Sequence, residues 1–254
     1  MGVDVLPLQG RRIGVTRPRR QAGNLCRMIE ERGGRAHRFP MIEIAAVEPL
    51  PGGDWWRGQD WLIFVSANAV RFALAAGLRA PGARLAAIGR ATAAALEKNG
   101  FQVACRAPAP YTSESLLDQD CFRQVNGRRI LIVRGVGGRP KLAETLAGRG
   151  AEVSLAELYR RLPPSRAAVE TLRACLCRGL DAVLVTSAEV LANLQRAAGE
   201  GVEALRALPL VVGGERLAGK AWAARFEDVT AAASALDADM LAALEKRLVQ
   251  ERKA

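Results

Sequence analysis

The stretch Arg11–Arg17 reads RRIGVTR, and Arg128–Arg134 reads RRILIVR further along the chain. Each begins with two arginines and continues with a short apolar run. Each is followed by a stretch with helical spacing that ends at a glycine, Gly33 in the first copy and Gly150 in the second. Short, nearly continuous apolar runs are typical of strands that are covered on both faces. The sequence therefore predicts two similar strand-then-helix units.

Two further matches extend this similarity in the same order. Asp60–Ala67 matches Asp181–Ala188, and Ala86–Gly89 lines up with Leu210–Gly213. Three ordered matches favour two related α/β modules, although βα units look alike and chance similarity is the alternative. Strands are predicted at six apolar runs: Arg12–Thr16, Trp61–Val65, Arg84–Ile88, Ile130–Val133, Asp181–Val185 and Leu208–Val212. Because these runs alternate with helical stretches, the fold class is α/β with parallel sheets.

The composition excludes several classes of protein. The chain has 254 residues, of which 50% are hydrophobic, and no apolar run approaches the ~18 residues that a membrane span needs. Asp4 interrupts any signal-peptide core, so we expect an unprocessed protein. Five cysteines without zinc-like spacing favour a reducing cytoplasm. The single histidine, His37, makes a Ser-His-Asp triad improbable and a histidine-rich metal centre impossible.

The formal net charge is +11, and arginine supplies most of the positive charge. Two windows, residues 11–38 and 123–161, contain nine basic residues each and few acidic ones. Guanidinium groups bind carboxylates and phosphates in a planar, two-pronged geometry. Concentrated arginine therefore indicates a polyanionic partner, with ordinary solvated arginines as the alternative for most positions.

Ligands of open parallel sheets bind beyond the carboxyl ends of the strands. The residues expected there are small, hydroxylic or basic, and turns of this kind expose backbone N–H groups to an anion. The residues that follow the predicted strands are Thr16-Arg17, Ser66-Ala67-Asn68, Gly89 to Thr92, Arg134-Gly135, Thr186-Ser187 and Gly213-Gly214.

Two glycine-containing stretches approach nucleotide-binding motifs without matching them. Gly214–Ala221 has the spacing of a phosphate loop, but Ala221 replaces the hydroxyl residue that ligates Mg²⁺. In Gly135–Gly138, Pro140 occupies the place of the third glycine of a dinucleotide fingerprint. We therefore predict no nucleotide, no organic cofactor and no metal.

The strand-end motifs together resemble the uroporphyrinogen-III synthase family. The similarity lies in their order and spacing over nearly the whole chain, and no single motif is diagnostic. The motifs are Gly14–Pro18, Phe64–Val70, Ala87–Ala93, Tyr111–Leu117, Val133–Gly135 with Gly138-Arg139, Glu157–Arg161 and Val185–Ser187.

The resemblance implies two flavodoxin-like parallel-sheet domains, one inserted into the other and joined by a two-stranded linker. The outer domain would comprise residues 1–40 and 163–254, and the inserted domain residues 41–162. Leu162-Pro163-Pro164 suits the second joint because proline disfavours helix and sheet. The first βα unit would then be exchanged between the two modules.

The reaction that the resemblance implies converts hydroxymethylbilane, a linear tetrapyrrole with eight carboxylates, into uroporphyrinogen III. It comprises dehydration to a cationic azafulvene, inversion of the terminal pyrrole through a spiro intermediate, and ring closure. The enzyme's task is mainly to hold a flexible chain so that inverted closure is faster than direct closure. Such chemistry needs no histidine.

The resemblance also implies roles for individual residues. Tyr159 matches the family's linker tyrosine and is our candidate for helping the hydroxyl leave, with simple packing as an equal alternative. The expected substrate contacts are Arg17, Ser66, Asn68, Gly89, Thr92, Arg134, Gly135, Ser187, Gly213 and Gly214. At Gly213 and Gly214 many relatives carry hydroxyl residues, so only a backbone contact is expected there.

Two other hypotheses are weighed against the synthase. One is a two-lobed module that closes on an anionic small molecule without catalysis. The other is nucleic-acid binding, which the low aromatic content of 5% disfavours for single strands. We expect hydroxymethylbilane as the partner, neither nucleic acid nor membrane, and a state compatible with a monomer.

Overall fold

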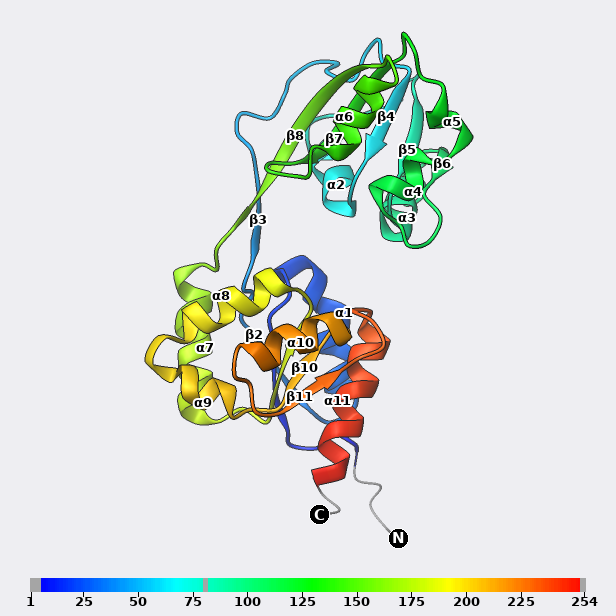
Figure 1. Cartoon of the computed structure of the whole chain (residues 1–254). Helices are drawn as coiled ribbons and strands as arrows, with labels where there is room; N and C mark the ends of the chain where they lie inside the picture. Colours follow the sequence, from blue (N-terminus) through cyan, green and yellow to red (C-terminus); the bar gives the residue numbers. More distant parts are fainter. Residues whose placement is uncertain (1–5, 80–81, 252–254) are drawn as a thin grey trace. The chain divides into compact units, whose positions relative to one another are not determined.

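The computed structural model describes residues 6–79 and 82–251, which fold as two units. Unit 1 comprises Met1–Glu43 and Leu162–Ala254, and unit 2 comprises Ile44–Arg161. The chain therefore changes unit at 43/44 and 161/162, where the sequence predicts boundaries at 40/41 and 162/163. Each unit is described by itself below (Figure 1).

Unit 1 contains a five-stranded parallel sheet with the order β11-β10-β9-β1-β2. Its strands are β1 (Arg12–Val15), β2 (Arg35–Arg38), β9 (Ala182–Val185), β10 (Leu210–Val212) and β11 (Val229–Ala231). Its helices are α1 (Arg19–Glu31), α7 (Arg166–Arg178), α8 (Ala188–Ala198), α9 (Val202–Arg206), α10 (Glu215–Ala223) and α11 (Asp237–Glu251).

Helices cover the sheet of unit 1 because their apolar positions recur at helical spacing. In α1, Leu25, Cys26 and Ile29 are buried, and they pack with Met240 and Leu244 of α11 on one face of the sheet. Alternate strand residues point to the opposite face, where α8 and α10 lie against each other. The result is a three-layer α/β/α unit, in agreement with the predicted fold class.

Unit 2 contains a six-stranded sheet with the order β3-β8-β7-β4-β5-β6. Its strands are β3 (Glu43–Ala46), β4 (Trp61–Phe64), β5 (Arg84–Ala87), β6 (Val103–Arg106), β7 (Arg129–Gly135) and β8 (Glu152–Leu162). Its helices are α2 (Ala67–Ala75), α3 (Arg90–Lys98), α4 (Ser113–Leu117), α5 (Asp120–Arg123) and α6 (Lys141–Gly148). The first residue of β3 and the last residue of β8 belong to unit 1, so both crossings of the chain occur at strand ends.

Strand β4 shows how the sheet of unit 2 is buried on both sides. Leu62 and Phe64 pack on one face with residues of α2 and α3, whereas Trp61 and Ile63 pack on the other face with residues of α4, α5 and α6. A strand in this environment needs apolar residues at every position, which is what WLIF supplies.

The internal repeat of the sequence maps onto equivalent places in the two sheets. Strand β1 lies between β9 and β2, and β7 lies between β4 and β8 in the same way. Each repeat therefore gives its first βαβ segment to one unit and its later strands to the other. Within residues 6–79 and 82–251, no helix combines the length and hydropathy needed to cross a membrane.

Candidate functional site

The carboxyl ends of β4 and β5 present helix starts to solvent. Ser66 is the N-cap of α2, and its Oγ accepts a hydrogen bond from the N–H of Ala69 at 3.1 Å. Gly89 is the N-cap of α3. Both helix starts occur where an apolar strand gives way to a small or hydroxylic residue, as the sequence predicts.

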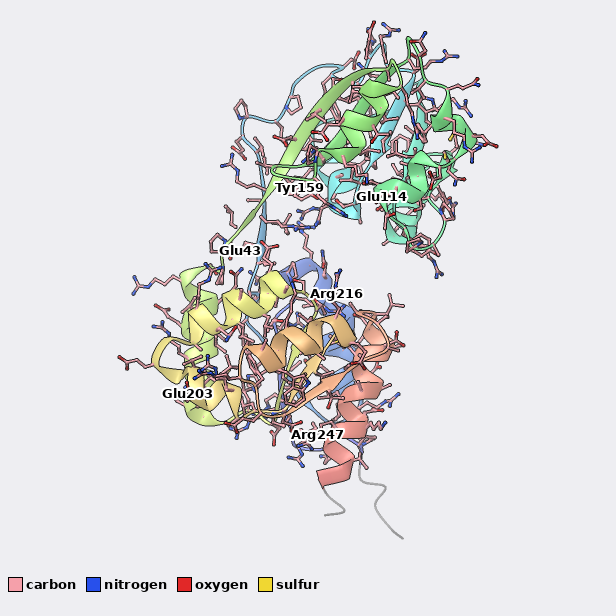
Figure 2. All side chains as sticks on the ribbon, in the orientation of Figure 1. Glu43, Glu114, Tyr159, Glu203, Arg216 and Arg247 are labelled. Atoms are coloured by element: carbon pink, nitrogen blue, oxygen red, sulfur yellow. The ribbon has the colours of Figure 1, made fainter. Side chains whose placement is uncertain are left out.

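Tyr159 lies on β8, opposite Gly135 at the end of β7 (Figure 2). Its ring is stacked on Phe72 with a centroid distance of 5.5 Å and an interplanar angle of 13°. A Cβ atom on Gly135 would come within 2.6 Å of the same ring. The side chain is only 5% exposed, so packing fixes the direction in which its hydroxyl points.

The hydroxyls of Tyr159 and Ser66 are hydrogen-bonded at 2.8 Å, and either oxygen can be the donor. Ser66 Oγ accepts from the Ala69 N–H and also carries a hydrogen, so it can donate to the phenolic oxygen or accept from it. Where Ser66 is the donor, the Tyr159 O–H is left to donate to another group. This pair links the start of α2 to the Tyr159 hydroxyl.

A pocket of about 490 Å³ lies at this end of the sheet. Four of the predicted site residues line it: Ser66, Arg134, Gly135 and Tyr159. Other lining residues come from the start of α4 and the loop before it, from the loop after β7, and from β8. They include Tyr111, Thr112, Ser113, Gly138, Arg139 and Arg161. Three arginines and no carboxylate stand among the described lining residues, which suits an anionic guest.

Arg134 is held rigidly at the edge of this pocket. It is 6% exposed, and its Nε donates to the carbonyl oxygen of Gly135 at 3.2 Å. Glu157 lies 3.5 Å from the same nitrogen, and the carbonyl oxygen of Arg139 accepts from Nη1 at 3.4 Å. These contacts fix the guanidinium group in place before any ligand binds.

Three other predicted residues of unit 2 lie at strand ends outside this lining. Asn68 is half-buried in the first turn of α2. Thr92 is buried in the first turn of α3, and its Oγ1 would be 3.4 Å from a Cβ atom on Gly89. They continue the row of strand-end residues away from Tyr159.

The remaining predicted residues belong to unit 1. Ser187 is the N-cap of α8 and accepts from the N–H of Val190 at 3.2 Å, as Ser66 does in unit 2. Gly214 is the N-cap of α10 with φ of +127°, a conformation that glycine adopts readily. Gly213 approaches Ala235 so closely that a Cβ atom would lie 2.9 Å from the alanine Cβ.

Arg17 is engaged within unit 1. It is 9% exposed, and its two terminal nitrogens contact the Asp237 carboxylate and the carbonyl oxygen of Ala235. Arg17 therefore ties the end of β1 to the start of α11. The structure thus brings together Ser66, Arg134, Gly135 and Tyr159, whereas Arg17 has a well-defined internal partner.

A larger cavity of about 840 Å³ lies at the amino ends of β5 and β6. Its lining includes Arg84, Asn99 and Phe101 and none of the predicted site residues. Because ligands of parallel sheets bind at the carboxyl ends of the strands, the smaller pocket is the stronger candidate. Volume alone does not decide between them.

Four residues at or beside the pocket are not predicted from the sequence as site residues: Phe72, Tyr111, Arg139 and Arg161. Phe72 on α2 has the spacing of a core residue, and only its stacking on Tyr159 reveals its position at the site. The other three lie within motifs that carry the family resemblance. Within the described part of the chain, no three His, Cys, Asp or Glu side chains form a metal-binding group.

Comparisons with known proteins agree with this architecture. A sequence family described as uroporphyrinogen-III synthase HemD matches residues 24–242. The chain is 36% identical over 245 residues to the uroporphyrinogen-III synthase of Salmonella typhimurium, covering 91% of this chain and 98% of that protein. It is 34% identical over 191 residues to the enzyme of Escherichia coli, covering 71% and 77% respectively.

A solved structure supports the fold independently of sequence. Uroporphyrinogen-III synthetase from Helicobacter pylori superimposes with a TM-score of 0.63 at 15% identity, covering 93% of this chain and 99% of that one. At this identity the similarity concerns the fold alone. The match over residues 24–242 and the identity to the bacterial relatives go further, and the chain belongs to the uroporphyrinogen-III synthase family.

Proposed function

We propose that the chain converts hydroxymethylbilane into uroporphyrinogen III, with Tyr159 as the group that helps the hydroxyl leave. The observation that carries the assignment of Tyr159 is its 2.8 Å hydrogen bond with Ser66 at the mouth of an arginine-lined pocket. The family membership supports the reaction itself.

The first step is loss of water from the hydroxymethyl group. Tyr159 donates its hydrogen bond or proton to the departing hydroxyl, while the electron pair of the adjacent pyrrole nitrogen forms the azafulvenium cation. Ser66 donates to the phenolic oxygen and stabilises the negative charge that develops there. Its own oxygen is held by the Ala69 N–H at the start of α2.

The arginines contribute binding and not proton transfer. Arg134, Arg139 and Arg161 line the pocket, and carboxylates of the bilane are the ligands that guanidinium groups prefer. A guanidinium close to the cationic carbon would oppose its formation, so we place these side chains at the periphery of the substrate. Held in this way, the linear tetrapyrrole closes with inversion of its terminal pyrrole before the direct closure can occur.

We extend the proposal to the other predicted contacts. Asn68, Gly89 and Thr92 of unit 2, with Ser187, Gly213 and Gly214 of unit 1, would contact substrate side chains through hydroxyls, amides and backbone N–H groups. Five of the six lie at N-caps or in first helical turns, where unpaired N–H groups favour carboxylates. Arg17 would act through the position that Asp237 gives it.

The proposed setting is the cytoplasm, with the protein as a monomer. All five cysteines are free thiols, which fits a reducing compartment. Sedimentation at micromolar concentration measures the oligomeric state, and a single species of about twice the 27.2 kDa chain mass would overturn the monomer.

The decisive experiment incubates the protein with freshly prepared hydroxymethylbilane and separates the type III and type I products. We expect the type III isomer from the wild-type chain. The Tyr159→Phe variant keeps the ring and loses the hydroxyl, so its rate should fall by about 10²–10⁴-fold while the type I isomer accumulates. Because the ring stays stacked on Phe72, unfolding should change by only about 0.5–1.5 kcal/mol.

The control is Thr145→Val on α6, which removes a hydroxyl from the same unit away from the pocket lining. It should retain wild-type turnover. Type I product alone from the wild-type protein would favour the non-catalytic binding module. Full turnover by a folded Tyr159→Phe variant would leave the reaction in place and refute the role of Tyr159.

A further inference from the structure

Unit 2 contains a pair of thiols in contact. Cys105 lies on β6 and Cys121 in α5, and their Sγ atoms are 2.8 Å apart. A disulfide bond requires about 2.05 Å, so the sulfurs are within roughly 0.8 Å of bonding distance. The other three cysteines, Cys26, Cys175 and Cys177, belong to unit 1.

The two thiols differ in access to solvent. Cys105 is 9% exposed and packs with Leu116 and Phe122, whereas Cys121 is half-buried. Burial, and then the hydrogen bond with Cys121, raises the pKa of Cys105 to about 12. Cys105 is therefore protonated at neutral pH, and a reagent from solvent meets Cys121 first.

The segment between the two cysteines forms part of the wall of the 490 Å³ pocket. Tyr111, Thr112 and Ser113 lie in this segment and line the pocket. Thr112 also caps α4, since its Oγ1 accepts from the N–H of Ser115 at 3.2 Å. A covalent link between Cys105 and Cys121 would close a ring that contains this wall.

We propose that Cys105 and Cys121 are an oxidation site, at which a hydroperoxide converts the thiols into a disulfide that restrains the pocket wall. Disulfides that form in reducing compartments are usually transient and serve catalysis or redox sensing. The ring stabilises the native segment chiefly by restricting the unfolded chain. The inference depends on the thiol geometry and holds whether or not the pocket binds the bilane.

The chemistry balances with hydrogen peroxide as the two-electron oxidant. Cys121 first releases its proton, and the thiolate so formed attacks one peroxide oxygen: an S–O bond forms, the O–O bond breaks, and the departing hydroxide becomes water by taking up the proton that Cys121 released. Cys105 sulfur then attacks the sulfenic sulfur of Cys121. The S–S bond forms, the S–O bond breaks, and the hydroxyl leaves as a second water with the proton of Cys105.

The test uses the full-length reduced protein treated with a small excess of hydrogen peroxide. Peptide mapping should recover a Cys105–Cys121 linked peptide, and the intact protein should lose two hydrogens in mass. Dithiothreitol should reverse both changes. Amide exchange over Tyr111–Leu117 should become roughly tenfold slower or more in the oxidised protein, while exchange in α8 of unit 1 should not change.

Two variants make the assignment specific. Cys121→Ser should abolish the linked peptide and the slower exchange, whereas Cys177→Ser, which removes an exposed thiol of unit 1, should leave both intact. The site is refuted if the wild-type chain gives only Cys121 sulfinic acid or no linked peptide. Unchanged exchange in a fully linked protein would overturn the restraint of the wall. Both refuting results are measured on the wild-type protein, so they do not require the variants to fold.

Discussion

The substitution Gly135→Ala tests whether the orientation of Tyr159 matters. The added Cβ atom would lie 2.6, 2.7 and 3.1 Å from three atoms of the Tyr159 ring, where ordinary contacts exceed 3.4 Å. The ring must therefore move by nearly 1 Å. It is stacked on Phe72 and almost fully buried, so it cannot move without disturbing that packing.

The magnitude follows from these distances. Overpacking of a buried site costs about 1–3 kcal/mol of unfolding free energy. A shift of this size directed away from Ser66 also lengthens the 2.8 Å contact between the Tyr159 and Ser66 hydroxyls beyond hydrogen-bonding distance. Misplacement by this amount costs about 10²-fold in rate. Turnover should therefore fall by about two orders of magnitude in a protein that still folds.

The assay measures type III and type I products by chromatography and stability by urea unfolding. The matched control is Gly148→Ala at the end of α6, because a Cβ atom there meets nothing within 4 Å. It should match the wild type in rate and gain up to about 1 kcal/mol in stability. Equal rates for the two variants would refute the argument that Gly135 sets the position of the Tyr159 ring.

Two further predictions concern unit 1. Burial, followed by the charges of Arg35, Arg12 and Arg178, lowers the pKa of His37, so the unfolded chain binds the proton more tightly. Stability should therefore fall as the pH drops below about 6.5, and His37→Gln should flatten this dependence in urea titrations between pH 7.5 and 5.5. An identical slope in the variant would exclude His37 as its source. Asp237→Asn removes the charged partner of buried Arg17 and should cost about 1.5–3 kcal/mol in the same assay; a cost below 0.5 kcal/mol would show that Arg17 does not depend on this ion pair.

Apolar runs predicted the covered strands, whereas strands with polar residues escaped this signal. WLIF in β4 and AVLV in β9 are buried at every position, and such strands must be apolar throughout. By contrast, β2 reads RAHR and is partly exposed, and β8 carries several charged residues over its 11 positions. No apolar run predicted β8, and the family resemblance marked only the Glu157–Arg161 motif and the linker tyrosine within it.

The site was predictable as a set of strand ends and not as a set of contacts. Ser66 and Tyr159 are 93 residues apart in sequence, and only the placement of β7 between their strands brings the hydroxyls together. The contact of Phe72 with Tyr159 could not be predicted either, because Phe72 occupies a position on α2 that suits any aromatic residue of a core. For Arg17, the prediction was a substrate contact at a strand end. Its partner Asp237 lies 220 residues further along the chain, so sequence spacing could not reveal the ion pair.

The exchange of segments between the units has a consequence during translation. Unit 2 is continuous and can fold once residue 161 has left the ribosome, whereas β1 waits for its neighbour β9 until residue 185 has emerged. A folded insert then holds the flanking chain together, since Val47 is hydrogen-bonded to Leu158. This shortens the effective loop between β1 and β9 from about 170 to about 60 residues and reduces the entropy cost of closure by about 1 kcal/mol. The folded unit 2 therefore brings the two segments of unit 1, before residue 44 and after residue 161, closer together along the chain.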